Sequence, residues 1–158
     1  MRTMTILVVL VIVVLLAAVL FGVYRTVKSE RSGNQEKFVR GTADSASVDG
    51  DYIGNVPGLD VSWQGKTFNQ AESSGINRFK EGDRVTTNYP FKTYVAKGLR
   101  DKDTDVIVLD YNQPGNPWWL RFIVDEMVST APNTYLGKVH IRALPRVVFT
   151  MGYFTLEK

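Results

Sequence analysis

The stretch Thr5 to Tyr24 reads TILVVLVIVVLLAAVLFGVY, and its apolar run from Ile6 to Val23 has no charged, amide or proline residue. At about 1.5 Å of rise per residue, a helix over this stretch is about 30 Å long, the thickness of the hydrocarbon core of a bilayer. The run is longer than the apolar region of a signal peptide, and Tyr24, Arg25 and Thr26 stand where a small-residue cleavage site would follow. The sequence therefore predicts one uncleaved transmembrane helix that places the chain at a lipid bilayer.

Three residues of this helix bear on its neighbours. Tyr24 lies where the interfacial aromatic belt of a membrane is expected, so it is a candidate for interface or docking contacts. Ala18 and Gly22 have the small-xxx-small spacing that lets a second membrane helix pack closely. The same two residues also fit an ordinary helix that faces lipid, and both interpretations stay open.

The flanking charges bear on which side of the membrane holds the rest of the chain. Only Arg2 and the α-amino group precede the helix, whereas five basic residues follow it: Arg25, Lys28, Arg31, Lys37 and Arg40. The positive-inside rule therefore favours a cytoplasmic domain. The leading tail is short, however, and many N-terminal anchors export their domains, so the side is left open.

We divide the chain into a transmembrane anchor (1–28), a flexible stem (29–50) and a β-rich globular domain (51–158). The stem is rich in Ser, Gly and Asp, a composition that buries too little apolar surface to offset the entropy cost of ordering. Phe38 and Val39 are its candidates for local docking. The globular part is long enough for one domain with a core of its own.

Short apolar and aromatic runs, separated by Gly, Pro and Asn, indicate that the globular part is mainly β. We expect strands over 59–63, 63–68, 85–96, 106–111, 135–143 and 147–156, the last two forming an antiparallel hairpin. Gly65 indicates a bulge or a close approach of backbones, and Pro90 indicates an edge or a bulge. The pattern predicts a small β-barrel or a curved antiparallel sheet with one short helix.

The segment 117–128 is the candidate for that helix. Asn116 can cap it, and Pro117 suits a first helical position, where its missing N–H costs nothing. The part 121–128 also fits a strand, and this alternative stays open.

Several short motifs resemble a known family. The spacing Trp63-x-Gly65-Lys66-x-Phe68 is similar to a motif of small, uncharacterised bacterial lipocalin-like β-barrel domains of the GxWxG kind. The segments Leu136-Gly137 and Tyr153-Phe154-x-Leu156 resemble the closing strands of such domains, although Val61 stands where the leading glycine of the motif would be. What the resemblance implies is a β-barrel with an apolar interior. It brings no catalytic residue.

Charge and composition exclude several classes of function. Six of the 19 basic residues lie in the first forty positions, so the chain from Gly41 onward has 13 basic and 14 acidic residues. Nucleic-acid binding needs a concentrated basic field, which this domain lacks. The absence of cysteine excludes disulfides, thiolate metal sites and thiol catalysis, and it leaves the redox compartment open.

Candidate catalytic groups are scarce. His140 is the only histidine, and its place in an alternating strand puts it on a solvated face or a polar wall of the lumen. The acids of 101–105 lack the Gly and Glu positions of a calcium loop, so they fit a charged turn. Asp125 and Glu126 are adjacent and diverge. We therefore expect no enzyme, no cofactor and no metal site.

Asp110 is an acid that needs a partner, because it stands in an apolar strand beside Tyr111. Arg121 or Lys138 could supply the positive charge. We expect a structural buried ion pair between Asp110 and Arg121, since buried charges usually exist in pairs. A catalytic role would require Asp110, Tyr111 and Arg121 to meet in a pocket.

The segment 112–120 (NQPGNPWWL) is a stiff turn that presents Trp118 and Trp119 side by side. Both cannot face one core from a helix start, so we expect at least one to be exposed or to cover a barrel mouth. Exposed tryptophans are typical of membrane interfaces and of protein-interaction sites. The alternative, that both cap the hydrophobic core, stays open.

Two functions from different classes fit these features. The first is a non-enzymatic accessory subunit that docks on an integral-membrane protein complex through the anchor and the tryptophan pair. The second is a tethered lipocalin-like carrier of an apolar small molecule, which requires an internal cavity of at least ~300 Å³. The candidates for the lining of its lumen are Tyr52, Trp63, Phe91, Tyr94, Val108, Phe149 and Tyr153.

Overall fold

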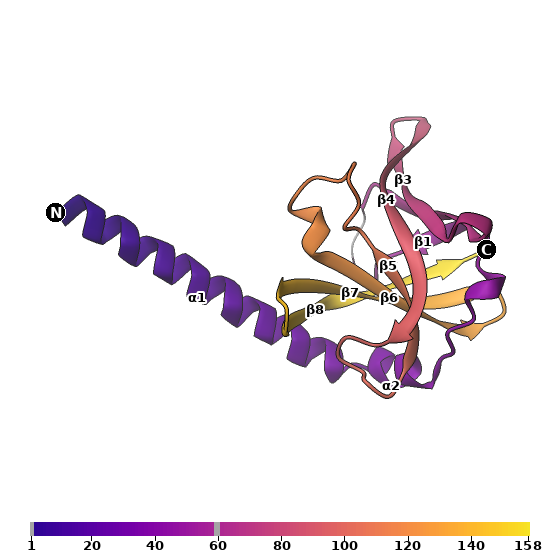
Figure 1. Cartoon of the computed structure of the whole chain (residues 1–158), viewed down its shortest axis with the longest axis horizontal. Coiled ribbons are helices and arrows are strands. Elements are labelled where there is room, and N and C mark those ends of the chain that lie inside the picture. Colours follow the sequence, from indigo (N-terminus) through magenta and orange to yellow (C-terminus); the bar gives the residue numbers. More distant parts are fainter. Residues whose placement is uncertain (1, 59–60) are drawn as a thin grey trace.

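The chain forms one long helix, one short helix and a closed antiparallel β-barrel (Figure 1). The computed structural model describes residues 2–58 and 61–158. Helix α1 (Arg2–Glu30) is followed by α2 (Gly33–Arg40), and eight strands then close into the barrel. The predicted class, mainly β with an N-terminal apolar helix, is confirmed.

Each strand of the barrel pairs with the next one along the chain, and β8 closes the barrel on β1. The strands are β1 (Gly50–Asn55), β2 (Trp63–Asn69), β3 (Ser74–Glu81), β4 (Arg84–Lys97), β5 (Asp105–Asp110), β6 (Ile123–Ala131), β7 (Thr134–Leu144) and β8 (Val147–Glu157). Short 3-10 turns lie at η1 (Ser45–Ser47), η2 (Gln70–Glu72) and η3 (Leu120–Phe122). The expected β7–β8 hairpin is confirmed, whereas the strand expected over 59–63 falls partly outside the described residues.

Two irregularities expected from the sequence bend the strands. The pairing of β2 with β3 shifts at Gly65, whose φ is +118° and whose missing side chain lets the Tyr52 carbonyl oxygen approach. The pairing of β3 with β4 shifts opposite Pro90, where Tyr89 has a φ of 61°. Each bulge changes the direction in which the neighbouring side chains point. Lys66 and Tyr89, which adjoin the two bulges, border the lumen cavity described below.

The helix expected over 117–128 does not form, and the strand alternative is correct. A turn and η3 lead into β6, which begins at Ile123. Asn116, expected to cap a helix, stabilises this turn instead. Its side-chain amide donates to the carbonyl oxygens of Pro90 and Tyr111, at 2.7 and 2.8 Å. Both faces of β6 are buried, which hides the alternation that marks a half-exposed strand.

The segment 29–50, expected to be a flexible stem, contains α2 and η1. Helix α2 lies against β6 and β7, with Phe38 fully buried and Val39 exposed. The Phe38 ring packs edge-on against the Tyr153 ring, with 6.3 Å between centroids. The short helix of the fold class is therefore α2, folded onto the outside of the barrel.

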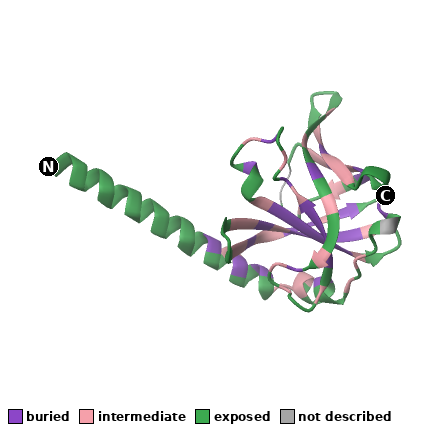
Figure 2. Ribbon diagram, in the orientation of Figure 1, coloured by how far each residue is buried: buried purple, intermediate pink, exposed green. Residues whose placement is uncertain are grey.

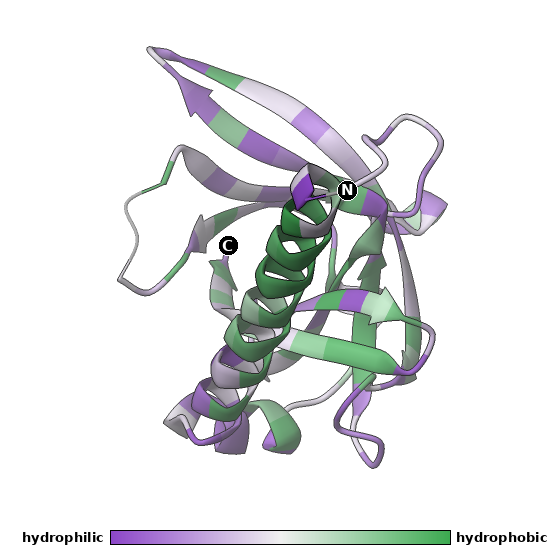
Figure 3. Cartoon of the chain, turned by 90° about the vertical axis from the view of Figure 1, so that its left-hand side faces the viewer, coloured by the Kyte–Doolittle hydropathy of each residue, from purple (hydrophilic) through white to green (hydrophobic). Residues whose placement is uncertain are grey.

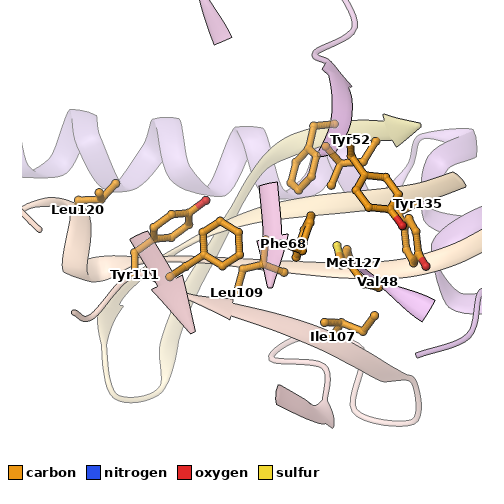
Figure 4. Close-up of a cluster of buried hydrophobic side chains, with 12 residues drawn as sticks. Val48, Tyr52, Phe68, Ile107, Leu109, Tyr111, Leu120, Met127 and Tyr135 are labelled. Carbon is orange, nitrogen blue, oxygen red and sulfur yellow. The ribbon is translucent and has the colours of Figure 1, made fainter. Parts of the chain in front are cut away.

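Apolar side chains form two clusters, one on each side of the barrel wall. The inner cluster lies in the lumen, and Figure 4 shows Leu120 and Tyr111 toward one end of it and Tyr135 toward the other. The outer cluster lies on the opposite face of the wall and includes Phe38 of α2. Alternate residues of β5 enter the two clusters, so this strand is buried on both faces.

Helix α1 contacts the barrel only near its C-terminal end. Residues 2–21 are exposed (Figure 2), and Figure 3 shows that this projecting part is apolar. The helix is long and apolar enough to cross a membrane. Its buried residues, which face β8, are Gly22, Thr26 and Ser29.

The small-xxx-small pair is divided between two environments. Gly22 packs on the ring of Phe149, and a Cβ at Gly22 would lie 2.7 Å from that ring. Ala18 is exposed on the projecting part of α1. The small size of Gly22 therefore serves the contact between α1 and the barrel.

Candidate functional site

A cavity of about 680 Å³ extends from the lumen to α1 and the segment after it, where Arg25, Lys28, Ser29, Ser32 and Asn34 border it. Strands and loops around the barrel supply its apolar walls, which include Val56, Phe79, Leu120, Ile123, Val139 and Phe154. Small-molecule pockets typically have volumes of about 300–1,000 Å³. The cavity is therefore large enough for a ligand of ordinary size.

A buried ion pair crosses the lumen at this cavity. Lys66 on β2 and Asp125 on β6 both border it, with Nζ 3.0 Å from Oδ2. The two side chains are only 3% and 6% exposed, so the pair is almost fully desolvated. Burial lowers the pKa of Lys66, and the Asp125 carboxylate opposes that shift.

Three more polar side chains complete what we term the lumen polar cluster: Lys66, Asp125, Tyr111, Asn77 and Trp63. The Tyr111 hydroxyl donates to Asp125 Oδ2 at 3.0 Å, and Lys66 donates to both the Tyr111 hydroxyl and Asn77 Oδ1. Trp63 Nε1 donates to Asn77 Oδ1 at 3.0 Å. Burial, with the nearby Asp125 charge, raises the pKa of Tyr111 well above its usual value.

Aromatic rings enclose the Lys66 ammonium group. Its Nζ lies 5.2 to 5.3 Å from the ring centroids of Trp63, Phe91, Tyr111 and Phe154. Such cation–π contacts partly replace the water that the ammonium has lost. They hold the cation at the floor of the cavity.

The cavity reaches the end of the barrel from which α1 projects. Exposed loop residues Pro57 and Gly58 border it, and Arg25 and Lys28 border it from α1. Figure 1 shows the loop before β6 and the β7–β8 turn on this same side of the barrel. Arg25 fastens α1 here by donating from Nε to the Met151 carbonyl oxygen, at 2.8 Å.

A second polar cluster lies outside the barrel wall, under α1. His140 Nε2 is 3.0 Å from Glu126 Oε2, and both residues are fully buried. His140 Nδ1 lies 3.2 Å from Thr150 Oγ1, and the Thr150 N–H donates to Thr26 Oγ1 on α1, at 2.9 Å. The expectation of a solvated or lumen-facing His140 was therefore wrong, because α1 packs against β8 and α2 packs against β7 on the outer side of the wall. Asp125 and Glu126 do diverge, as expected.

Lys138 is also fully buried outside the wall, where it pairs with Asp101 of the predicted charged turn. Gln35 of α2 accepts hydrogen bonds from Lys138, at 2.8 Å, and from the Tyr153 hydroxyl, at 2.7 Å. These contacts hold the turn and α2 on the barrel. Within the described ranges, no group of three His, Asp or Glu side chains is placed to hold a metal ion.

The predicted lining residues are divided by the barrel wall. Those inside the barrel are Tyr52, Trp63 and Phe91. Those on the outer side are Tyr94, Val108, Phe149 and Tyr153, although Tyr153 also borders the cavity. In a strand with both faces buried, the alternation of residue types does not reveal which face points into the lumen. A register shift between β7 and β8 also changes which residues of these strands point inward.

The predicted ion pair between Asp110 and Arg121 does not form. Asp110 Oδ1 accepts the Asn112 N–H at 2.9 Å, and Arg121 donates to the carbonyl oxygens of Asn116 and Pro114. The two carbonyl groups belong to the loop that precedes Arg121, so Arg121 stabilises this loop and does not pair with Asp110. Asp110, Tyr111 and Arg121 do not meet in one pocket, because only Tyr111 borders the cavity.

Trp118 and Trp119 are both exposed, which agrees with the expectation that at least one of them would be. Trp118 is 74% and Trp119 49% exposed, and neighbouring Phe122 is 48% exposed. We term these three residues the aromatic rim. Trp119 packs edge-on against Tyr89, and Trp118 against Phe122, with centroid distances of 6.2 and 6.3 Å. Tyr24 on α1 is exposed as well.

Lys66, Asn77 and Asp125 are the site residues that sequence reasoning missed. A lysine two positions before Phe68 in a predicted strand was the one available signal, because it puts a cation on the same face as an apolar residue. Asp125 falls within the helix that was expected over 117–128 and does not form. No family model matches the chain, and comparisons with curated proteins and with solved structures give no match.

Proposed function

We propose that this protein is a membrane-tethered barrel that binds an amphipathic small molecule in its lumen. The observation that carries the proposal is the cavity of about 680 Å³, whose walls inside the barrel are apolar and whose floor is polar. An apolar cavity with a few convergent polar groups is the usual form of a ligand site. The closed barrel also agrees with the lipocalin-like resemblance, since Gly137 and Phe154 of its motifs pair on β7 and β8.

The ligand would come from the bilayer. The cavity reaches the end of the barrel from which α1 projects, so a membrane-spanning α1 turns this end toward the lipid surface. The aromatic rim lies on the loop before β6, at that same end. Tryptophan and phenylalanine there would sit at headgroup depth.

Photolabelling of the full chain in lipid nanodiscs tests the proposal. The probes are tetradecanol, its methyl ether and tetradecanoic acid, each with a diazirine in the chain. We expect saturable labelling of peptides that contain cavity residues. Val139→Trp, which fills the cavity, removes this labelling, whereas Val85→Trp on the exposed β3–β4 hairpin preserves it. Labelling confined to residues 2–21 of α1, or equal in both variants, would contradict a lumen site.

An accessory subunit that docks on an integral-membrane protein complex is the second candidate. The observation in its favour is the exposure of Trp118 and Trp119, since exposed aromatic residues are common binding hot spots. Purification in mild detergent should then yield a stoichiometric complex that Trp118→Ser/Trp119→Ser disrupts and Val139→Trp does not. A chain that always elutes alone removes this candidate.

A further inference from the structure

We infer that the ligand of the lumen is an uncharged amphiphile whose polar end donates a hydrogen bond to Asp125 Oδ1. This inference rests on the proposed function and names the chemistry of the ligand. It follows from an inventory of donors, acceptors and charges at the floor of the cavity.

The donors of the lumen polar cluster are already used. Lys66 donates to Asp125, Asn77 and the Tyr111 hydroxyl, which occupies all three of its N–H groups. The Asn77 amide nitrogen donates to the Tyr89 carbonyl oxygen and to the Tyr111 hydroxyl, at 3.0 and 3.1 Å. Trp63 donates its one N–H to Asn77. The cluster therefore has no N–H left for an anionic headgroup.

One acceptor remains. Asp125 uses only Oδ2 for Lys66 and Tyr111, and Oδ1 accepts no hydrogen bond from any residue in the described ranges. The Asp125 side chain is 6% exposed and borders the cavity. Oδ1 is therefore free to accept a hydrogen bond at the cavity, and a ligand hydroxyl would supply the donor.

The charges at the floor select a neutral donor. Lys66 and Asp125 together carry no net charge. A ligand carboxylate at Oδ1 would face the like charge of Asp125, and a ligand ammonium would face Lys66 across a distance of a few bond lengths. A hydroxyl meets neither repulsion. Of the two α1 cations that border the cavity, Arg25 already donates to the Met151 carbonyl oxygen, and Lys28 Nζ lies 6.0 Å from the ring centroid of Tyr24.

Competition among three matched probes tests the inference, with the full chain in nanodiscs and partition into empty nanodiscs subtracted. The probes are tetradecanol, its methyl ether and tetradecanoic acid. We expect the alcohol to bind about tenfold tighter than the ether or the acid, because only the alcohol offers a donor without a charge. Equal or tighter binding of the ether or the acid overturns the inference while leaving the lumen site in place.

Two double variants locate the origin of the preference. Lys66→Met/Asp125→Leu replaces the lumen pair by apolar residues, and the alcohol should then lose its advantage over the ether. Lys138→Met/Asp101→Leu removes the buried pair outside the wall and should keep the advantage. An advantage that survives the first variant overturns the inference, and failure of all three probes to bind wild type overturns the proposed function with it. The wild-type ranking decides the matter if a variant does not fold.

Discussion

Lys66 on β2 and Asp125 on β6 join two strands that are not neighbours in the sheet, with 3.0 Å between Nζ and Oδ2. The pair is a strut across the lumen as well as the floor of a cavity. The two roles can be separated by experiment. The structural role affects the free energy of unfolding, whereas the role in the cavity affects which ligand binds.

Removing one member of this pair should destabilise the barrel strongly. Lys66→Met leaves Asp125 buried without its counter-ion, and we expect a loss of about 3–5 kcal/mol in the free energy of unfolding. Lys66→Met/Asp125→Leu should recover most of that loss, since an apolar pair carries no desolvation cost. Denaturant unfolding of the full chain in detergent measures both values. Equal losses for the single and double variants would contradict a paired role.

Alkaline pH should weaken the fold through buried tyrosines. Burial, with the neighbouring Tyr135 phenol, raises the pKa of Tyr52 to about 12, and the pKa values of Tyr111 and Tyr153 are raised as well. A raised folded-state pKa gives stability that is complete below about pH 10, the unfolded pKa, and is lost as pH rises through the folded value.

Unfolding followed from pH 10 to about 12 measures this loss, and Tyr52→Phe should make it smaller. The absorbance of tyrosinate, recorded in parallel, should rise with unfolding. Ionisation of Tyr52 near pH 10 in a chain that stays folded would contradict the prediction.

The contact between α1 and β8 should depend on Gly22. Gly22→Leu would drive a side chain into the Phe149 ring and separate the helix from the barrel. The Thr150 N–H, which donates to Thr26 Oγ1, should then lose protection against hydrogen exchange. Ala18→Leu is the matched control, because Ala18 is exposed. Loss of protection in both variants, or in neither, would show that Gly22 does not set this contact.

The bulge at Gly65 should tolerate no side chain. At φ +118°, with the Tyr52 carbonyl oxygen in the place of a Cβ, Gly65→Ala combines backbone strain with a collision. We expect a loss of at least about 3 kcal/mol or failure to fold. Gly115→Ala, at a loop position with open space around it, should be close to neutral. Comparable stability of the two variants in thermal unfolding would argue against the bulge geometry.

The sequence predicted much of the architecture and little of the site. The apolar run over 6–23, the bulges at Gly65 and Pro90, and the final hairpin were all readable, because each depends on local pattern. The strand β6 was not, because both of its faces are buried and its two acids each meet a distant partner. Asp125 meets Lys66, and Glu126 meets His140.

Those partners lie far apart in the chain, so no local window contains them. Which face of a doubly buried strand points inward is decided by closure of the barrel, and Val108 and Phe149 were assigned to the lumen for lack of that information. Helix α2 escaped prediction for a related reason. Only Phe38 of its eight residues is buried, and the stability of so short a helix comes from the barrel beneath it.

Native mass spectrometry of the full chain, released from nanodiscs loaded with tetradecanol, is the most direct test of lumen binding. Wild type and Val85→Trp should each retain one bound tetradecanol molecule, and Val139→Trp should retain none. Retention of tetradecanol by Val139→Trp, or a wild-type chain without bound tetradecanol, would contradict the proposal that the barrel binds a lipid-like molecule in its interior.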